Sequence, residues 1–198
     1  MHNPPPPDVE TCLISSAAEV MRRRSLGNMA LTAIESNGLL TLEEANEDIF
    51  LQGPSFALAH CVSQDLRMSA GIARDFIRHF GGREMLLTQP HSVGEVATLK
   101  RKIEGIVSQG HYIIFCIITK IHYHDKPTYK DFSLGIQNLA RECTRRKIKK
   151  LAIPRIGCGL DQLDWGQVRS IIVREFREIP INIKVCNWTS PNTRSKIN

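Results

Sequence analysis

The sequence has few aromatic residues, no C-x-x-C pair of cysteines and no long apolar run, and each absence excludes a class of protein. Aromatic residues make up 6% of the 198 positions, fewer than expected in a protein that stacks nucleic-acid bases on exposed rings. Neither the six cysteines nor the seven histidines have the spacing of zinc ligands, which predicts buried free thiols and no metal site. No segment is long and apolar enough to span a membrane or resembles a secretory signal.

Free thiols and the missing secretory signal predict a protein of the nucleus, the cytoplasm or both. The net charge of +6 favours anionic partners such as phosphates, nucleic acid or acidic lipid, but general solubility explains it equally well. Three arginines and four acids precede Leu39, so the rest of the chain carries a net charge of +7.

The composition changes near residue 38. Before it lie a proline run at 4–7 and a loosely helical pattern at 15–34, and we expect 1–38 to be a disordered extension. Residues 39–190 have the regular patterns of one folded domain, and 191–198 form a short tail. The size of this domain and the lack of an apolar seam predict a monomer.

In the regular part, apolar segments typical of strands alternate with amphipathic helical patterns. The helices are expected after the capping residues Ser69, Thr128 and Asp164. The strands are expected at 39–42, 56–62, 94–99, 111–118, 150–153 and 181–185. The almost wholly apolar run 111–118 is typical of a central strand covered on both faces. This order predicts an α/β fold with a mixed or mostly parallel sheet and helices on both sides.

Four segments follow the ends of predicted strands and could meet around one ligand: 47–50, 60–73, 118–120 and 154–161. The start of the helix near Gly71 offers free N–H groups to a phosphate, or is a small-residue turn. Gly157 and Gly159, separated by one residue, permit an anion-binding backbone nest or an ordinary strand-to-helix turn.

Two charged residues near these strand ends are candidates for catalysis. Lys120 follows the central apolar strand, where desolvation could make its amine a nucleophile, although a solvated lysine is the simpler interpretation. Asp161 has the same ambiguity. His122 and His124 are more simply surface residues than metal ligands, because no acidic pair lies near them.

Six strings, in one order along the chain, resemble macrodomains of the terminal ADP-ribose protein glycohydrolase group, also called O-acyl-ADP-ribose deacylases. They lie at 58–73, 80–82, 94–97, 118–120, 126–129 and 154–161. Two of them, L-A-H-C at 58–61 and P-R-I-G-C-G-L-D at 154–161, are specific to this branch of macrodomains. The resemblance covers residues 42–188 and implies a three-layer α/β/α sandwich that binds ADP-ribose without metal or cofactor.

The resemblance also implies a binding site. Asp48 is expected to accept a hydrogen bond from the adenine amino group, with Ile49 beside it and Trp188 near the ring. The remaining substrate-binding residues implied by similarity are Ser63, Gly71, Ile72, Thr119, Arg155, Ile156, Gly157, Cys158, Gly159 and Leu160, which line the distal ribose and diphosphate.

The two catalytic residues of the group correspond to Lys120 and Asp161. The implied reaction removes mono-ADP-ribose from glutamate or aspartate side chains of proteins, and deacylates O-acyl-ADP-ribose, through a lysyl intermediate. The alternative is a non-catalytic module that only binds ADP-ribose, which would need neither residue. The basic run 145–150 could belong to a nucleic-acid-binding module, but a solvated end of a helix is the simpler interpretation of it. ADP-ribosylated nucleic acid stays open as a substrate.

Two positions depart from the pattern of the group. Glu47 precedes Asp48 where Gly is usual, and we expect its added negative charge to weaken nucleotide binding. Ile121 and His122 follow Lys120 where a basic pair is usual, which predicts a less reactive lysine.

Overall fold

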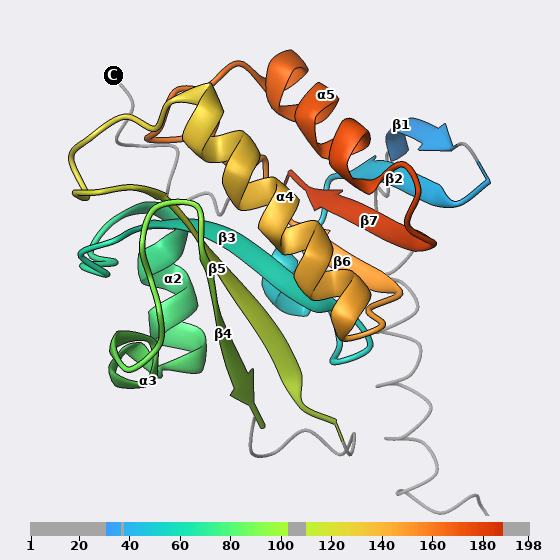
Figure 1. Cartoon of the computed structure of the whole chain (residues 1–198). Helices are drawn as coiled ribbons and strands as arrows, with labels where there is room; N and C mark the ends of the chain where they lie inside the picture. Colours follow the sequence, from blue (N-terminus) through green and yellow to red (C-terminus); the bar gives the residue numbers. More distant parts are fainter. Residues whose placement is uncertain (1–30, 37, 103–109, 188–198) are drawn as a thin grey trace, which may run out of the picture. The chain divides into compact units, whose positions relative to one another are not determined.

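The computed structural model of the chain describes residues 31–36, 38–102 and 110–187, with side chains from residue 38 onward. Its strands form one sheet in the order β1-β2-β7-β6-β3-β5-β4 (Figure 1). The bounds are Leu31–Ser36 for β1, Leu40–Ala45 for β2, Ala57–Ser63 for β3, Val96–Arg101 for β4, Tyr112–Lys120 for β5, Lys150–Ile153 for β6 and Ile181–Cys186 for β7. In this order, the five inner strands β2, β7, β6, β3 and β5 run parallel to their inner neighbours. The edge strands β1 and β4 are antiparallel to β2 and β5. The predicted mixed, mostly parallel sheet is confirmed.

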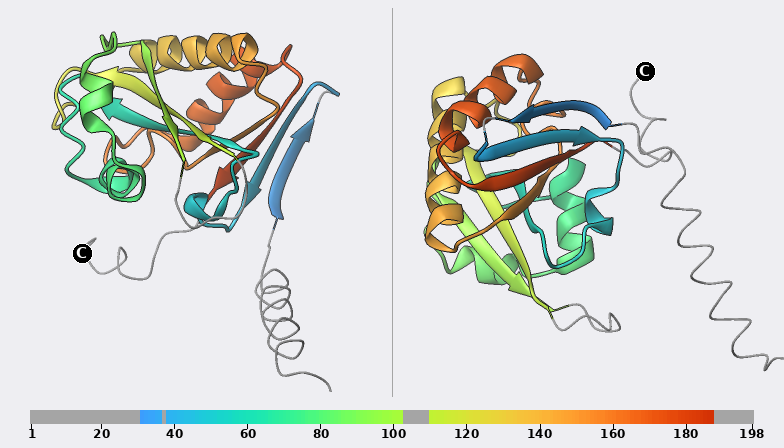
Figure 2. Two further views of the ribbon diagram at one scale, coloured as in Figure 1. Left: turned by 90° about the horizontal axis from the view of Figure 1, so that it is seen from below. Right: turned by 90° about the vertical axis from the view of Figure 1, so that its right-hand side faces the viewer.

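Helices cover both faces of this sheet. Helices α4 (Tyr129–Arg145) and α5 (Trp165–Phe176) lie on one face, and α2 (Gly71–Phe80) and the short α3 (Arg83–Leu87) on the other (Figure 2). Each side has its own cluster of buried apolar residues against the sheet. The molecule is therefore the three-layer sandwich that the sequence predicts.

The local signals for α4, α5 and β5 are confirmed. The hydroxyl of Thr128 accepts the N–H of Asp131 at 3.1 Å, and Asp164 accepts that of Gln167 at 2.9 Å, so both residues cap their helices. Along β5, Phe115 belongs to the cluster under α4 and α5, whereas the next residue, Cys116, belongs to the cluster under α2. This alternation explains why the strand is apolar throughout.

The structure corrects two expectations near helix and strand starts. Leu31–Ser36 pairs with β2 as strand β1, so the helical pattern 15–34 does not hold at its end. Ala and Met favour a helix locally, but the free edge of β2 offers hydrogen bonds that local composition does not reveal. Helix α2 starts at Gly71 after Ala70, and Ser69 does not cap it. Residues 1–30 and 188–198 lie outside the described residues.

The cysteines among the described residues are free thiols: Cys61, Cys116, Cys143, Cys158 and Cys186. Burial raises the pKa of Cys116 and Cys143 to about 12 each.

Among the helices of the described residues, none combines the length and the apolar character needed to cross a membrane.

Candidate active site

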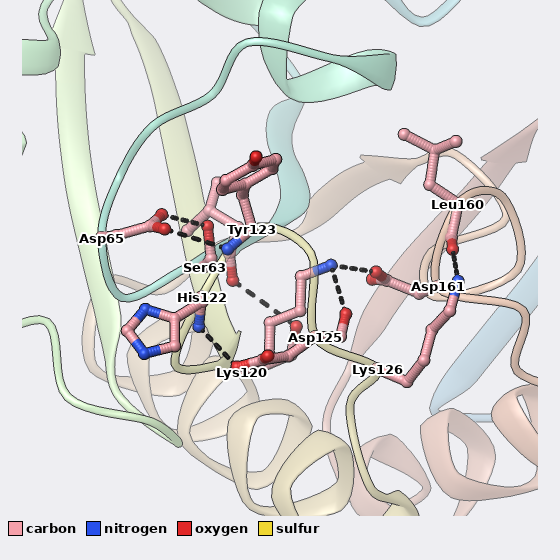
Figure 3. Close-up of polar contacts among 11 residues, drawn as sticks. Ser63, Asp65, Lys120, His122, Tyr123, Asp125, Lys126, Leu160 and Asp161 are labelled. Atoms are coloured by element: carbon pink, nitrogen blue, oxygen red, sulfur yellow. Dashed lines mark hydrogen bonds and ion pairs between the residues drawn. The ribbon is translucent and has the colours of Figure 1, made fainter.

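Lys120 and Asp161, 41 residues apart in the chain, are in direct contact beyond the carboxyl ends of the strands (Figure 3). Lys120 is the last residue of β5, and Asp161 lies in the loop between β6 and α5. The Nζ atom of Lys120 is 2.5 Å from Oδ1 of Asp161 and also donates to the Asp125 carbonyl at 3.1 Å. The two side chains retain 11% and 13% of their exposure. A ligand at this edge could reach both groups.

The hydrogen bonding of Asp161 leaves it free to take part in proton transfer. Lys120 is the one donor that its carboxylate has among the described residues. A carboxylate can accept about four hydrogen bonds, so most of its capacity is unused. At 2.5 Å the two groups form a short charge-assisted hydrogen bond, and the carboxylate keeps sites at which it could accept a further donor from a ligand.

The two glycines of the 154–161 loop have different structural roles. Gly157 has φ +74° and is buried, and a Cβ there would lie 2.9 Å from Leu163 and 3.2 Å from Phe132. The turn and its packing therefore explain this glycine. Gly159 is exposed, and a Cβ there would meet nothing within 4 Å. Close approach of a ligand to the backbone would account for it.

The start of α2 lies against the same loop. Gly71 has φ +56°, and a Cβ on it would lie 3.1 Å from Cδ1 of Leu160. Leu160 is 64% exposed, and its carbonyl accepts a hydrogen bond from Lys126. No side chain of the described residues caps α2, so the N–H groups of its first turn point out from the helix beside Ile72. The structure thus brings together the two segments predicted to bind the diphosphate.

Asp48 and Ile49 form the entry to a short helical turn. Asp48 Oδ1 accepts the N–H of Phe50 at 2.9 Å, and Ile49 is buried. The neighbouring Glu47 contacts Lys184 Nζ at 3.1 Å. The added negative charge at position 47 is therefore paired within the protein. The predicted adenine contact Trp188 lies outside the described residues.

Arg155 is held by a carboxylate that the sequence analysis missed. Its Nη2 donates to Glu44 at 2.8 Å, and its guanidinium carbon lies 5.4 Å from the centre of the Trp165 ring. Trp165 Nε1 and Asn187 Nδ2 donate to the same carboxylate at 3.0 and 3.2 Å. Burial acts to raise the pKa of Glu44, but these hydrogen bonds outweigh it and hold the pKa below its ordinary value. The side chain of Arg155 therefore anchors its loop to β2.

A signal for Glu44 was present in the sequence. In β2 the alternating positions Leu40 and Leu42 face the core, and Glu44 continues the same series. An acid on the apolar face of a strand indicates a buried carboxylate with partners elsewhere.

The remaining predicted residues are placed less directly. The Ser63 hydroxyl donates to Asp65 at 2.6 Å, at the end of β3. Thr119 is fully buried with its hydroxyl toward the Val62 carbonyl, and Ile156 is buried as well. The side chains of Thr119 and Ile156 therefore belong to the protein interior and are not exposed to a ligand. Cys158 is half-buried, and burial raises the pKa of its thiol to about 11.

The chain is similar in sequence to known proteins. The Macro domain family model matches residues 59–172. ADP-ribose glycohydrolase OARD1 of Homo sapiens is 41% identical over 138 residues, which are 70% of this chain and 86% of the relative. A DNA ADP-ribosyl transferase-DNA ADP-ribosyl glycohydrolase fusion protein of Thermosipho africanus is 26% identical over 84 residues, 42% of this chain and 21% of that protein.

Solved structures show the same fold. The macrodomain of Mycobacterium tuberculosis DarG superposes with a TM-score of 0.61 at 23% identity, covering 73% of this chain and 95% of the other. Thermosipho africanus DarTG in complex with ADP-ribose gives a TM-score of 0.65 at 21% identity, covering 83% and 46%.

Proposed function

The chain belongs to the macrodomain family, and from this premise we propose that it is an ADP-ribose glycohydrolase. We propose further that it removes mono-ADP-ribose from glutamate and aspartate side chains and deacylates O-acyl-ADP-ribose. The observation that carries the proposal is the 2.5 Å contact between Lys120 and Asp161 at the carboxyl edge of the sheet. The relatives named ADP-ribose glycohydrolase in Homo sapiens and Bos taurus support the general activity.

In the proposed complex, the adenine lies beside Asp48 and Ile49. The diphosphate lies between the start of α2 at Gly71 and the 157–160 segment, where backbone N–H groups can face the phosphate oxygens. The exposed, sterically free Gly159 supports this placement. Ser63 lies at the distal end, toward Lys120. Because its guanidinium is bound to Glu44, Arg155 contributes by fixing the loop.

The proposed reaction has two steps at the anomeric carbon of the distal ribose. Asp161 first accepts a proton from the Lys120 ammonium. The neutral amine then attacks the carbon, and the bond between that carbon and the acceptor oxygen breaks, with its electron pair leaving on a carboxylate, which takes the proton from Asp161. The ionised Asp161 next takes a proton from water, and the resulting hydroxide attacks the same carbon. The carbon–nitrogen bond breaks with its electron pair on the nitrogen, free ADP-ribose is released, and the amine takes the proton from Asp161 to restore the starting pair.

Ester substrates suit this reaction because a carboxylate is a weak base and leaves readily with the bond electrons. A nitrogen-linked arginine adduct has a much poorer leaving group. An acyl ester at the same carbon also leaves as a carboxylate, so the two proposed activities use one mechanism.

The proposal is tested by incubating the protein with a glutamate-ADP-ribosylated protein and measuring released ADP-ribose. The wild type is expected to release it, and Lys120→Ala and Asp161→Ala are expected to lose most of the activity. Lys130→Ala, an exposed lysine on α4, is the matched control and should behave as the wild type.

Titration with ADP-ribose in a calorimeter separates the alternatives. A wild type that binds ADP-ribose and releases none is a reader module and not a hydrolase. A wild type that binds no ADP-ribose contradicts the assignment of the site itself.

A further inference from the structure

Two loops beside Lys120 are joined into one surface. The backbone N–H of Gln64 donates to the Lys120 carbonyl at 2.8 Å, and that of Asp65 donates to the Ile121 carbonyl at 3.2 Å. The Tyr123 N–H donates to Asp65 Oδ2 at 2.9 Å. The β3–α2 turn and the β5–α4 loop are therefore held in register directly next to the amine.

The β3–α2 turn is conformationally strained in a way that exposes one arginine. Leu66 and Met68 have φ of 47° and 46°, a left-handed conformation that costs a non-glycine residue about 1 kcal/mol or more. Both side chains are buried, and Arg83 Nε donates to the Leu66 carbonyl at 2.6 Å. Burial of these two residues turns the intervening Arg67 outward.

The guanidinium of Arg67 lies over an exposed aromatic ring. Its guanidinium carbon is 4.3 Å from the centre of the Tyr123 ring, and Tyr123 is 44% exposed. A contact of this kind is a cation–π interaction, which restricts the guanidinium without neutralising it. Within the described parts of the chain, no carboxylate forms an ion pair with Arg67. Its charge is thus held in place but not neutralised.

The acids of this surface are already bound by donors of the protein itself. The Asp65 carboxylate accepts the Ser63 hydroxyl and the N–H groups of Arg67 and Tyr123. Burial acts to raise the pKa of Asp65, but these donors outweigh it and keep the pKa low. The Asp125 side chain is 36% exposed, but its Oδ2 accepts the His122 N–H at 2.8 Å and its Oδ1 lies 3.6 Å from Nε2 of His124. Arg67 and Tyr123 are therefore the groups that this surface offers most directly to an outside molecule.

We propose that Arg67 and Tyr123 form an acceptor-recognition surface, which binds acidic residues flanking the modified glutamate of a protein substrate. This inference rests on the proposed function. Figure 3 shows Tyr123 on one side of the Lys120 amine and Asp161 with Leu160 on the other. Leu160 belongs to the segment proposed to bind the diphosphate. The substrate polypeptide, which leaves the anomeric carbon that the amine attacks, is therefore expected to extend over the Tyr123 side.

The experiment compares three substrates. Two are ADP-ribosylated glutamyl peptides, one with aspartates and one with serines beside the modified residue, and the third is an acyl-ADP-ribose without a peptide. The wild type is expected to have a kcat/KM several-fold higher for the acidic peptide. Arg67→Gln should lower kcat/KM for that peptide by about tenfold, the effect of one charge-assisted hydrogen-bonded pair. It should leave the other two substrates within about twofold.

Matched variants test each half of the surface. Tyr123→Leu removes the ring and should lower kcat/KM for the acidic peptide by about threefold, the effect of an exposed cation–π pair. Arg78→Gln removes an arginine on α2 that is 70% exposed and should change none of the three rates. Arg67→Glu should reverse the preference toward a peptide with flanking lysines, a gain that a misfolded protein cannot show.

Several outcomes would overturn the inference: equal rates for both peptides with the wild type, or an equal loss on all three substrates with Arg67→Gln. Binding of the same peptides to Lys120→Ala gives the comparison without turnover. If the wild type hydrolyses nothing but Lys120→Ala still prefers the acidic peptide, the proposed function fails and the recognition surface stands. If hydrolysis occurs without any preference, the reverse holds.

Discussion

Two carboxylates, one at the end of β2 and one in the loop that follows β6, differ in their surroundings. Glu44, 6% exposed at the end of β2, accepts from Arg155, Trp165 and Asn187. Asp161, 13% exposed, is paired with Lys120. Both are charged groups removed from most of the solvent, and both contact a cation.

The difference lies in how far each charge is satisfied. The three donors around Glu44 come from three separate places in the chain and leave its carboxylate little to offer a ligand. A buried charge satisfied in this way holds structure together. Asp161 keeps acceptor capacity, and its partner Lys120 is a potential nucleophile. We therefore propose that unused hydrogen-bonding capacity beside a potential nucleophile distinguishes a reactive pair from a structural one.

Replacing Asp161 with Asn should give the largest effect, and on activity. We expect ADP-ribose release to fall by at least about 100-fold, the usual range for loss of a proton-transferring group. The amide still accepts from Lys120, so the free energy of unfolding in urea should change by less than about 1 kcal/mol. Retained activity with a large loss of stability would assign Asp161 a structural role like that of Glu44.

Replacing Glu44 with Ala should have the opposite profile. The change leaves the Trp165 and Asn187 donors without their acceptor, and we expect the free energy of unfolding to fall by about 2–3 kcal/mol. The exposed Glu178→Ala, at 76% exposure, is the control and should be neutral within about 0.5 kcal/mol. A stability within that range for Glu44→Ala would remove the distinction between the two carboxylates.

A third titratable group, His60, is fully buried without a charged partner among the described residues. It stacks on Phe76 at 4.0 Å, and burial lowers its pKa from 6.5 to about 3. The unfolded chain therefore binds one more proton than the folded chain between these values, so stability falls as the pH drops below 6.5. The loss from this residue should reach about 2 kcal/mol at pH 5.

Urea unfolding at pH 7 and pH 5 checks this effect. His60→Leu should show a smaller decrease between the two pH values, whatever its stability at pH 7. The Glu44 and Asp65 carboxyls have lowered pKa values and contribute only at more acidic pH. An unchanged decrease in His60→Leu would show that His60 is not the source.

The pair formed by Glu47 and Lys184 should give the smallest effect. Lys184 also lies 3.8 Å from Glu43, so it keeps an acidic partner when Glu47 is removed, and Glu47→Gly is expected to change ADP-ribose affinity by less than about threefold. Lys184→Met leaves the carboxylate unpaired near the nucleotide and should weaken binding more. Calorimetric titration of both variants measures the difference, and a large gain in affinity for Glu47→Gly would show that its charge is felt by the ligand.

Sequence reasoning found the parts of the molecule that depend on local chemistry. The period-two and helical patterns located the strands from β2 to β7 and the helices α2, α4 and α5. The side chains of Thr128 and Asp164 marked two helix starts. The rule that ligands bind beyond the strand ends selected the segments around Lys120 and 154–161, and the family resemblance assigned their chemistry.

Only the tertiary structure decided which distant groups meet. The 2.5 Å contact of Lys120 with Asp161 depends on the order of strands in the sheet, and so does the binding of Arg155 by Glu44. Strand β1 exists because β2 presents a free edge. Periodicity along a chain indicates which face of an element a residue occupies. Contacts between side chains of distant segments depend on the crossover connections and on burial, and the residues next to each side chain in the sequence predict neither.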